Sequence, residues 1–155
     1  EKAYEYGPGG FHPVHIGDVY STVASTGLPR YKVIAKLGRG GSATIWLASD
    51  LLLQSCVALK FNAARFTGRS QEISVMRRLL STNPQASGTQ SIIRLLDSFQ
   101  VEGPNGIHEV LVTEVVLGYN VLRFSSRELP PAQKVAAELA TGLEYIHSCD
   151  IVHGG

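Results

Sequence analysis

Three glycines within four residues form the part of this sequence best suited to hold a phosphate group. Residues 37–45 read LGRGGSATI, so Gly38, Gly40 and Gly41 lie between two apolar stretches. Residues without a side chain let backbone N–H groups approach phosphate oxygens closely. A tight hairpin with glycines at positive φ would give the same spacing, so the run alone leaves both interpretations open.

The residues that follow the glycines exclude two common phosphate-binding units. In a dinucleotide-binding unit the glycines open a helix, whereas a β-branched and aromatic stretch, residues 44–48, follows in this chain. A P-loop needs a lysine and then a serine or threonine after its last glycine, and this sequence has Ser42 and Ala43 instead. The pattern therefore predicts a glycine-rich turn between two strands.

A single lysine and a single glutamate further along could complete such a phosphate site. Lys60 is the one charge in an otherwise apolar strand pattern, and Glu72 lies at the edge of a helical apolar stripe. A lysine beneath the glycines could donate to phosphate oxygens, and a carboxylate could orient the lysine and keep it charged. Two plainer interpretations stay open: an edge-strand lysine that reaches solvent, and a solvated glutamate paired with Arg65 or Arg69.

The elements that must position these residues form an α+β pattern. The first thirty residues are rich in glycine and proline, which indicates an extended lead-in made of turns. Alternating apolar patterns then predict five strands in a mostly antiparallel sheet, at residues 31–37, 43–48, 55–61, 92–101 and 108–116. Helical periodicity predicts one helix over 70–80 and another over 131–148. We expect the second helix to carry one apolar face, made of Val135, Leu139, Leu143 and Ile146.

Composition excludes several classes of function. The 155 residues carry a formal net charge of +1, which leaves no broad field to hold nucleic acid or a membrane surface. Two cysteines far apart predict neither a disulfide framework nor a zinc site, and we expect no metal site in this chain. A reducing, intracellular setting fits this usage, and we expect a cytoplasmic or nuclear protein.

The order of the motifs resembles the protein kinase signature: a glycine-rich turn between strands, a lysine on the next strand and a glutamate on the following helix. The resemblance is closest to the SR-protein-specific serine/threonine kinases, especially the divergent fungal members. It is carried by the lead-in GGFHPVHIGD at residues 9–18 and by IWLASD at residues 45–50. The expected fold is therefore a kinase N-terminal lobe, with a five-stranded sheet and one helix, followed by the first helix of a truncated C-terminal lobe.

The same resemblance implies a hinge and an adenine slot. Val112–Val116 is similar to the hinge, with Thr113 as gatekeeper and backbone groups of Glu114 and Val116 facing adenine. Leu37, Ile45 and Ala58 would form the apolar walls, although plain core packing would use such residues too. The implied catalytic residues are Lys60 and Glu72, and the implied ATP contacts are Leu37, Gly38, Arg39, Gly40, Gly41, Ser42, Ala43, Ile45, Ala58, Lys60, Thr113, Glu114 and Val116.

The last residues resemble the approach to the kinase catalytic loop. His153 matches the histidine of that motif, and Gly155 stands where its aspartate belongs. We therefore expect a piece of a longer protein that is inactive by itself, because the catalytic aspartate and the Mg²⁺ ligands are not in this chain. Its expected parts are an extended segment over 1–30, an ATP-binding lobe over 31–118, and a connector with the start of the second lobe over 119–155.

The expected function is the ATP-binding part of a serine/threonine protein kinase that uses ATP and Mg²⁺. The resemblance implies protein substrates, with Arg/Ser-rich splicing factors as the class. The alternative is a non-catalytic, pseudokinase-like binding module that holds a partner through its lead-in or its exposed helix.

Overall fold

The computed structural model describes residues 2–22, 27–116 and 130–152. The chain divides into two units, one of residues 1–71 and 95–115 and the other of residues 72–94 and 116–155. The first unit contains the sheet, and the second contains both α-helices.

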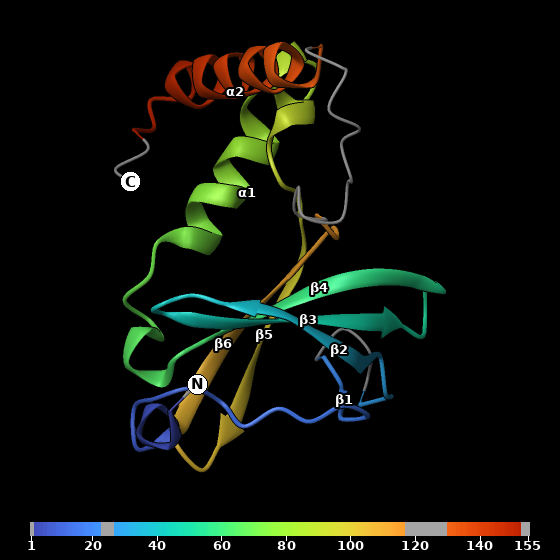
Figure 1. The fold of residues 1–155 in the computed structure, drawn as a ribbon, viewed down its shortest axis with the longest axis vertical. Coiled ribbons are helices and arrows are strands. Elements are labelled where there is room, and N and C mark those ends of the chain that lie inside the picture. The colour runs from blue at the N-terminus through green and yellow to red at the C-terminus, as the bar shows by residue number, and fades with distance from the viewer. Residues whose placement is uncertain (1, 23–26, 117–129, 153–155) are drawn as a thin grey trace. The chain divides into compact units, whose positions relative to one another are not determined.

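An antiparallel six-stranded sheet forms the centre of the first unit (Figure 1). Its strand order is β1-β2-β3-β4-β6-β5, so β4 lies in the interior with β3 on one side and β6 on the other. The strands are β1 (Val19–Tyr20), β2 (Tyr31–Arg39), β3 (Ala43–Asp50), β4 (Ser55–Asn62), β5 (Leu95–Gly103) and β6 (Gly106–Thr113).

The α+β class is confirmed, but the sheet has one strand more than the five expected. The additional strand, β1, lies in the segment expected to be extended, where Val19 and Tyr20 pair with Lys32 and Tyr31 of β2. Two residues are too few to show an alternating pattern, so no sequence signal marked this strand. The fourth expected strand begins later, at Leu95, and a short 3-10 helix of residues 87–91 precedes it in the chain.

The two faces of the sheet differ in burial. Val57, Leu59 and Phe61 of β4 point into a core cluster that also contains Trp46 and Val112. Side chains alternate along a strand, so Ala58 and Lys60 lie on the opposite face. The first face is the core of this unit, and we call it the core face.

The N-terminal segment packs on the core face. The Gly9 N–H donates to the Asn105 carbonyl at 2.8 Å, and the Asn105 side-chain amide donates to the Phe11 carbonyl at 2.6 Å. The ring of His12 stacks on Phe61, and burial, helped by neighbouring His108, lowers the pKa of His12 to about 4. His12 is therefore a neutral packing residue at physiological pH.

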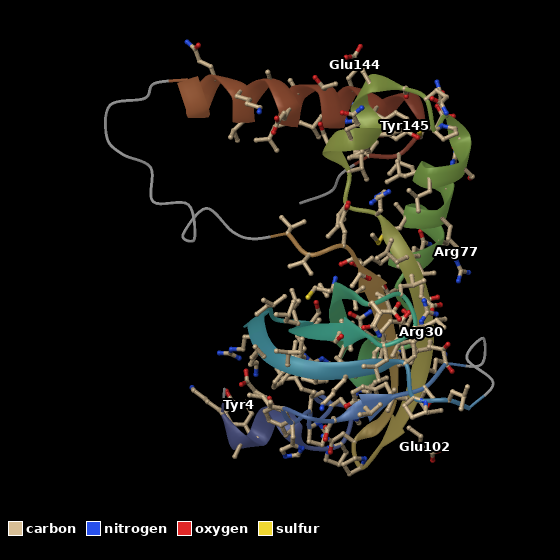
Figure 2. All side chains as sticks on the ribbon, turned by 90° about the vertical axis from the view of Figure 1, so that its right-hand side faces the viewer. Tyr4, Arg30, Arg77, Glu102, Glu144 and Tyr145 are labelled. Atoms are coloured by element: carbon tan, nitrogen blue, oxygen red, sulfur yellow. The ribbon has the colours of Figure 1, made fainter. Side chains whose placement is uncertain are left out.

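The second unit is built around helices α1 (Glu72–Thr82) and α2 (Pro130–Ser148). Its core contains Leu79 of α1 together with Tyr145 of α2 and Cys149 just beyond it, and the Tyr145 hydroxyl donates to the Leu79 carbonyl (Figure 2). The apolar face expected on α2 is only partly covered: Ile146 packs against this core, whereas Leu139 and Leu143 are 64% and 43% exposed.

An arginine between two carboxylates closes one end of the first unit. The Arg30 guanidinium donates to Asp50 at 3.1 Å and to Asp97 at 2.9 Å, and the Tyr31 hydroxyl also donates to Asp97, at 3.0 Å (Figure 2). Asp50 is 1% exposed and also accepts the N–H groups of Leu52 and Leu53. Burial favours a raised pKa for Asp50, but the bonds from Arg30 and from these N–H groups outweigh it and lower the pKa.

Replacing this carboxylate is expected to destabilise the sheet in a pH-dependent way. Asp50→Asn leaves Arg30 with Asp97 alone, and breaking a buried ion pair costs about 3 kcal/mol. Because the pKa of Asp50 is lowered in the folded protein, its charge stabilises the fold fully at pH values above the unfolded-state pKa of about 3.9. This stabilisation is lost as the pH falls through the folded-state pKa of Asp50. Urea unfolding should therefore show the full difference from wild type near pH 7 and a shrinking difference below about pH 4.

The matched control is Asp150→Asn, whose side chain is 90% exposed. This substitution should change the free energy of unfolding by no more than about 0.5 kcal/mol. Equal stabilities for wild type and Asp50→Asn at neutral pH would contradict the importance of this ion pair.

Close packing at Gly88 gives a second stability prediction. A Cβ at this position would lie 2.6 Å from the Thr141 carbonyl oxygen and would overlap the Cβ of Tyr145. Gly88→Ala should therefore destabilise the second unit by about 1–3 kcal/mol, the range for overpacking. Hydrogen exchange of the α2 amides measures this effect. Gly7→Ala, whose Cβ would meet only the Tyr4 carbonyl at an ordinary 3.5 Å, serves as the control and should leave that exchange unchanged.

Candidate nucleotide site

The glycine-rich turn joins β2 to β3 in an ordinary backbone conformation. The Gly40 N–H donates to the Ala43 carbonyl at 2.8 Å, which closes the turn. None of Gly38, Gly40 and Gly41 has a positive φ, and a Cβ added to any of them would meet no atom within 4 Å. The described protein therefore does not itself require glycine at these positions, and the interpretation as a hairpin with positive φ does not hold. A ligand that needs close access to the backbone would require glycine at these positions.

Lys60 lies on an interior strand. It pairs with Ile45 of β3 on one side and with Leu111 of β6 on the other, and its side chain is partly buried. The interpretation as an edge-strand lysine is therefore wrong. A lysine in the middle of a sheet must extend over the face of the sheet, which is where a ligand under the glycine turn would lie.

One face of the sheet carries five of the expected site residues. Lys60 and Ala58 alternate with the core residues of β4 and therefore share the face opposite the core. Strand pairing adds Ile45 opposite Lys60, Thr113 opposite Ala58 and Gly38 opposite Ile45. We call this face, with Gly38, Ile45, Ala58, Lys60 and Thr113, the lysine face.

Other expected site residues lie at the turn or point elsewhere. Leu37 is 40% exposed and lies in an irregular step of the β2–β3 pairing, whereas Ala43 is 3% exposed. Ser42 is at the tip of the turn, and its carbonyl accepts the Ala63 N–H at 2.8 Å. Arg39 pairs with Thr44, which belongs to the core face by alternation. The side chain of Arg39 therefore points away from the lysine face.

The expected hinge follows β6 directly. Thr113 is 7% exposed, and its hydroxyl donates to the Glu114 carbonyl at 3.1 Å. Val116 is 65% exposed and belongs to the second unit.

Glu72 is the first residue of α1 and is partly buried. It belongs to the second unit, whereas Lys60 belongs to the first. The expected pairing of these two side chains therefore stays a prediction. His153 and Gly155 lie outside the described residues, and the expectations attached to them stay predictions as well.

Sequence reasoning missed two residues that contact the glycine turn. The Arg65 guanidinium donates to the Gly41 carbonyl at 3.1 Å, and the Glu5 carboxylate accepts from Arg39 at 2.8 Å. Glu5 lies 34 positions before its partner, in a segment without a periodic pattern, so no local signal connected the two. In the described part of the chain, no three acidic, histidine or cysteine side chains cluster as metal ligands would.

Comparison with known proteins gives a consistent result. The sequence profile of the protein kinase domain matches residues 31–154. SRSF protein kinase 3 of Homo sapiens is 32% identical over 163 residues, which cover 99% of this chain and 27% of that protein. Protein kinase dsk1 of Schizosaccharomyces pombe is 36% identical, with coverages of 99% and 29%. Serine/threonine-protein kinase spk-1 of Caenorhabditis elegans is also 36% identical, with coverages of 99% and 16%.

These matches confirm the resemblance expected from the sequence motifs. The nematode and fission-yeast relatives share the same identity with this chain, so identity does not single out the fungal members. The chain spans less than a third of the length of these curated relatives. Among the described residues, no helix has the length and apolar character that crossing a membrane requires. The chain belongs to the protein kinase domain family, and the relatives that match almost all of it are kinases of the SRSF protein kinase type.

Proposed function

We propose that this chain is the ATP-binding part of a serine/threonine protein kinase, in which the whole enzyme transfers the γ-phosphate of ATP to protein hydroxyls. The observation that carries the proposal is the glycine turn. Its three glycines have ordinary φ values and open space around them, and the lysine face begins beside them. Glycines that the fold does not need are best explained by a ligand that approaches their backbone.

Each element of the lysine face has a role in this proposal. The turn would present N–H groups to the phosphates, and Lys60 would donate to the α- and β-phosphate oxygens. Ile45, Ala58 and Leu37 would enclose the adenine ring, and backbone groups of Glu114 and Val116 would bond to its edge. Glu72 would orient Lys60 from helix α1. ATP would bring Mg²⁺ with it, and we assign no described residue to hold that ion.

The proposal extends to the substrate of the whole enzyme and to the activity expected of the 155-residue chain. The name of SRSF protein kinase 3 supports protein substrates of the Arg/Ser-rich splicing-factor class. We also propose a cytoplasmic or nuclear location, for which the cysteine usage is the support. Because Gly155 occupies the position of the catalytic aspartate in the motif, we expect the 155-residue chain to bind ATP without transferring phosphate.

Removing the lysine tests the site directly. A charge-assisted hydrogen bond contributes about 1.5–3 kcal/mol, so Lys60→Ala should weaken ATP binding roughly ten- to a hundredfold. Titration with a fluorescent ATP analogue in the presence of Mg²⁺ measures the dissociation constant. The control is Lys32→Ala, an exposed lysine of β2 opposite Ser49, which should leave the constant unchanged. Equal binding by wild type and Lys60→Ala would contradict the proposal, and a folded chain that binds no nucleotide would favour the binding module.

The glycine turn gives a prediction in which stability and binding change in opposite directions. Gly40→Ala places a methyl group in open space, so the stability of the chain should stay constant or rise by about 0.4–1 kcal/mol. The same methyl group obstructs the approach of phosphate oxygens to the turn, and ATP binding should weaken roughly tenfold through lost hydrogen bonds. Thermal unfolding and the titration above measure the two effects. A less stable variant with unchanged ATP affinity would show that the glycine serves the fold.

A further inference from the structure

We propose that Glu5 is a positioning residue for the glycine-rich turn, and that residues 3–11 form a strap that braces this turn from the core-face side of the sheet. The strap precedes the matched kinase profile, which begins at residue 31. The effect of the strap on nucleotide affinity rests on the proposed function. The bracing of the turn does not.

The direct contact joins Glu5 to the turn. Nη1 of Arg39 donates to Oε1 of Glu5 at 2.8 Å and to Oε2 at 3.0 Å. The Lys2 N–H also donates to Oε2, at 2.7 Å. The bond from Lys2 and then the bond from Arg39 lower the pKa of Glu5, so the carboxylate is charged whenever the protein is folded near neutral pH. The side chains of Glu5 and Arg39 are 23% and 42% exposed.

The strap holds the backbone of Glu5 in place. The Phe11 N–H donates to the Glu5 carbonyl at 2.8 Å, which closes the strap on itself around the 3-10 helix Ala3–Tyr6. Gly10 passes so close to this carbonyl that a Cβ would overlap it, and the same Cβ would lie 2.8 Å from the Gly7 carbonyl oxygen. Phe11 is 2% exposed, so it anchors the end of the strap in the protein. Tyr4, by contrast, projects outward (Figure 2) and is 74% exposed.

The strap is also joined to the chain that follows β4. The Arg65 N–H donates to the Gly9 carbonyl at 2.9 Å, and the Ala64 N–H donates to the Gly10 carbonyl at 3.0 Å. The side chain of the same Arg65 bonds to the Gly41 carbonyl in the turn. A hollow of about 290 Å³ lies between strap and turn, and Glu5, Phe11, Gly41 and Arg65 are among the residues that line it.

The turn is therefore held at three points, none of which uses the lysine face. Arg39 is held by Glu5, the Gly41 carbonyl by Arg65 and the Ser42 carbonyl by the Ala63 N–H. A turn ordered in advance loses less conformational freedom when a phosphate binds to it. Release of Glu5 should therefore loosen the turn and weaken binding, by roughly two- to fivefold for a partly exposed ion pair.

The test uses Glu5→Gln, which keeps the shape of the side chain and removes its charge. Hydrogen exchange of residues 38–44, measured without nucleotide, should become roughly two- to fivefold faster, and the ATP analogue should bind two- to fivefold more weakly. In an Arg39→Ala background Glu5→Gln should have no further effect on either quantity, because the partner is already missing. The control is Glu102→Gln, at an exposed position of β5 labelled in Figure 2, which should change neither quantity.

Two outcomes would overturn the proposal. One is unchanged exchange of residues 38–44 in Glu5→Gln, and the other is an equal change with and without Arg39, which would reveal a general loss of structure. If exchange accelerates as expected but even the wild-type chain binds no nucleotide, the strap is supported and the proposed function is the part that fails.

Discussion

The pleat of β4 determines on which side of the sheet each functional group of the first unit lies. Eight residues of β3 pair with eight of β4 without irregularity, from Ala43 opposite Asn62 to Asp50 opposite Ser55. A slip of one residue would turn Lys60 into the core and expose Phe61. Burial of an unpaired ammonium group costs several kcal/mol, so the core that stabilises the sheet also fixes the lysine face.

Each end of the β2–β3 hairpin is held by a different arginine, and both arginines lie outside the apolar core. Arg30 precedes β2 and joins it to Asp50 and Asp97, whereas Arg39 ends β2 and bonds to Glu5. The two ends differ in environment, because the Arg30 side chain is 14% exposed and the Arg39 side chain is 42% exposed. Buried ion pairs resist disruption far more than exposed ones. The ion pairs therefore hold the hairpin more firmly at the Arg30 end than at the glycine turn.

Local patterns predicted the elements that carry the site, and long-range contacts determined the rest. The glycine turn, the strand with Lys60 and the helix with Glu72 each have a signal of their own within about ten residues. The bonds of Glu5 to Arg39 and of Arg30 to Asp97 join residues 34 and 67 positions apart, and no periodicity encodes such partners.

The bond between Asn105 and the Phe11 carbonyl spans 94 positions, which has a consequence for the order in which the protein assembles. The strap leaves the ribosome before β4 and the β5–β6 hairpin do, yet it can dock only after these strands have been synthesised and paired. Contacts of such separation form late, because the ends of a long loop must meet first. Phe11 and Val14, both buried in the finished fold, therefore stay uncovered until those strands have been made. The strap is made before the strands it packs on and settles into the structure after them.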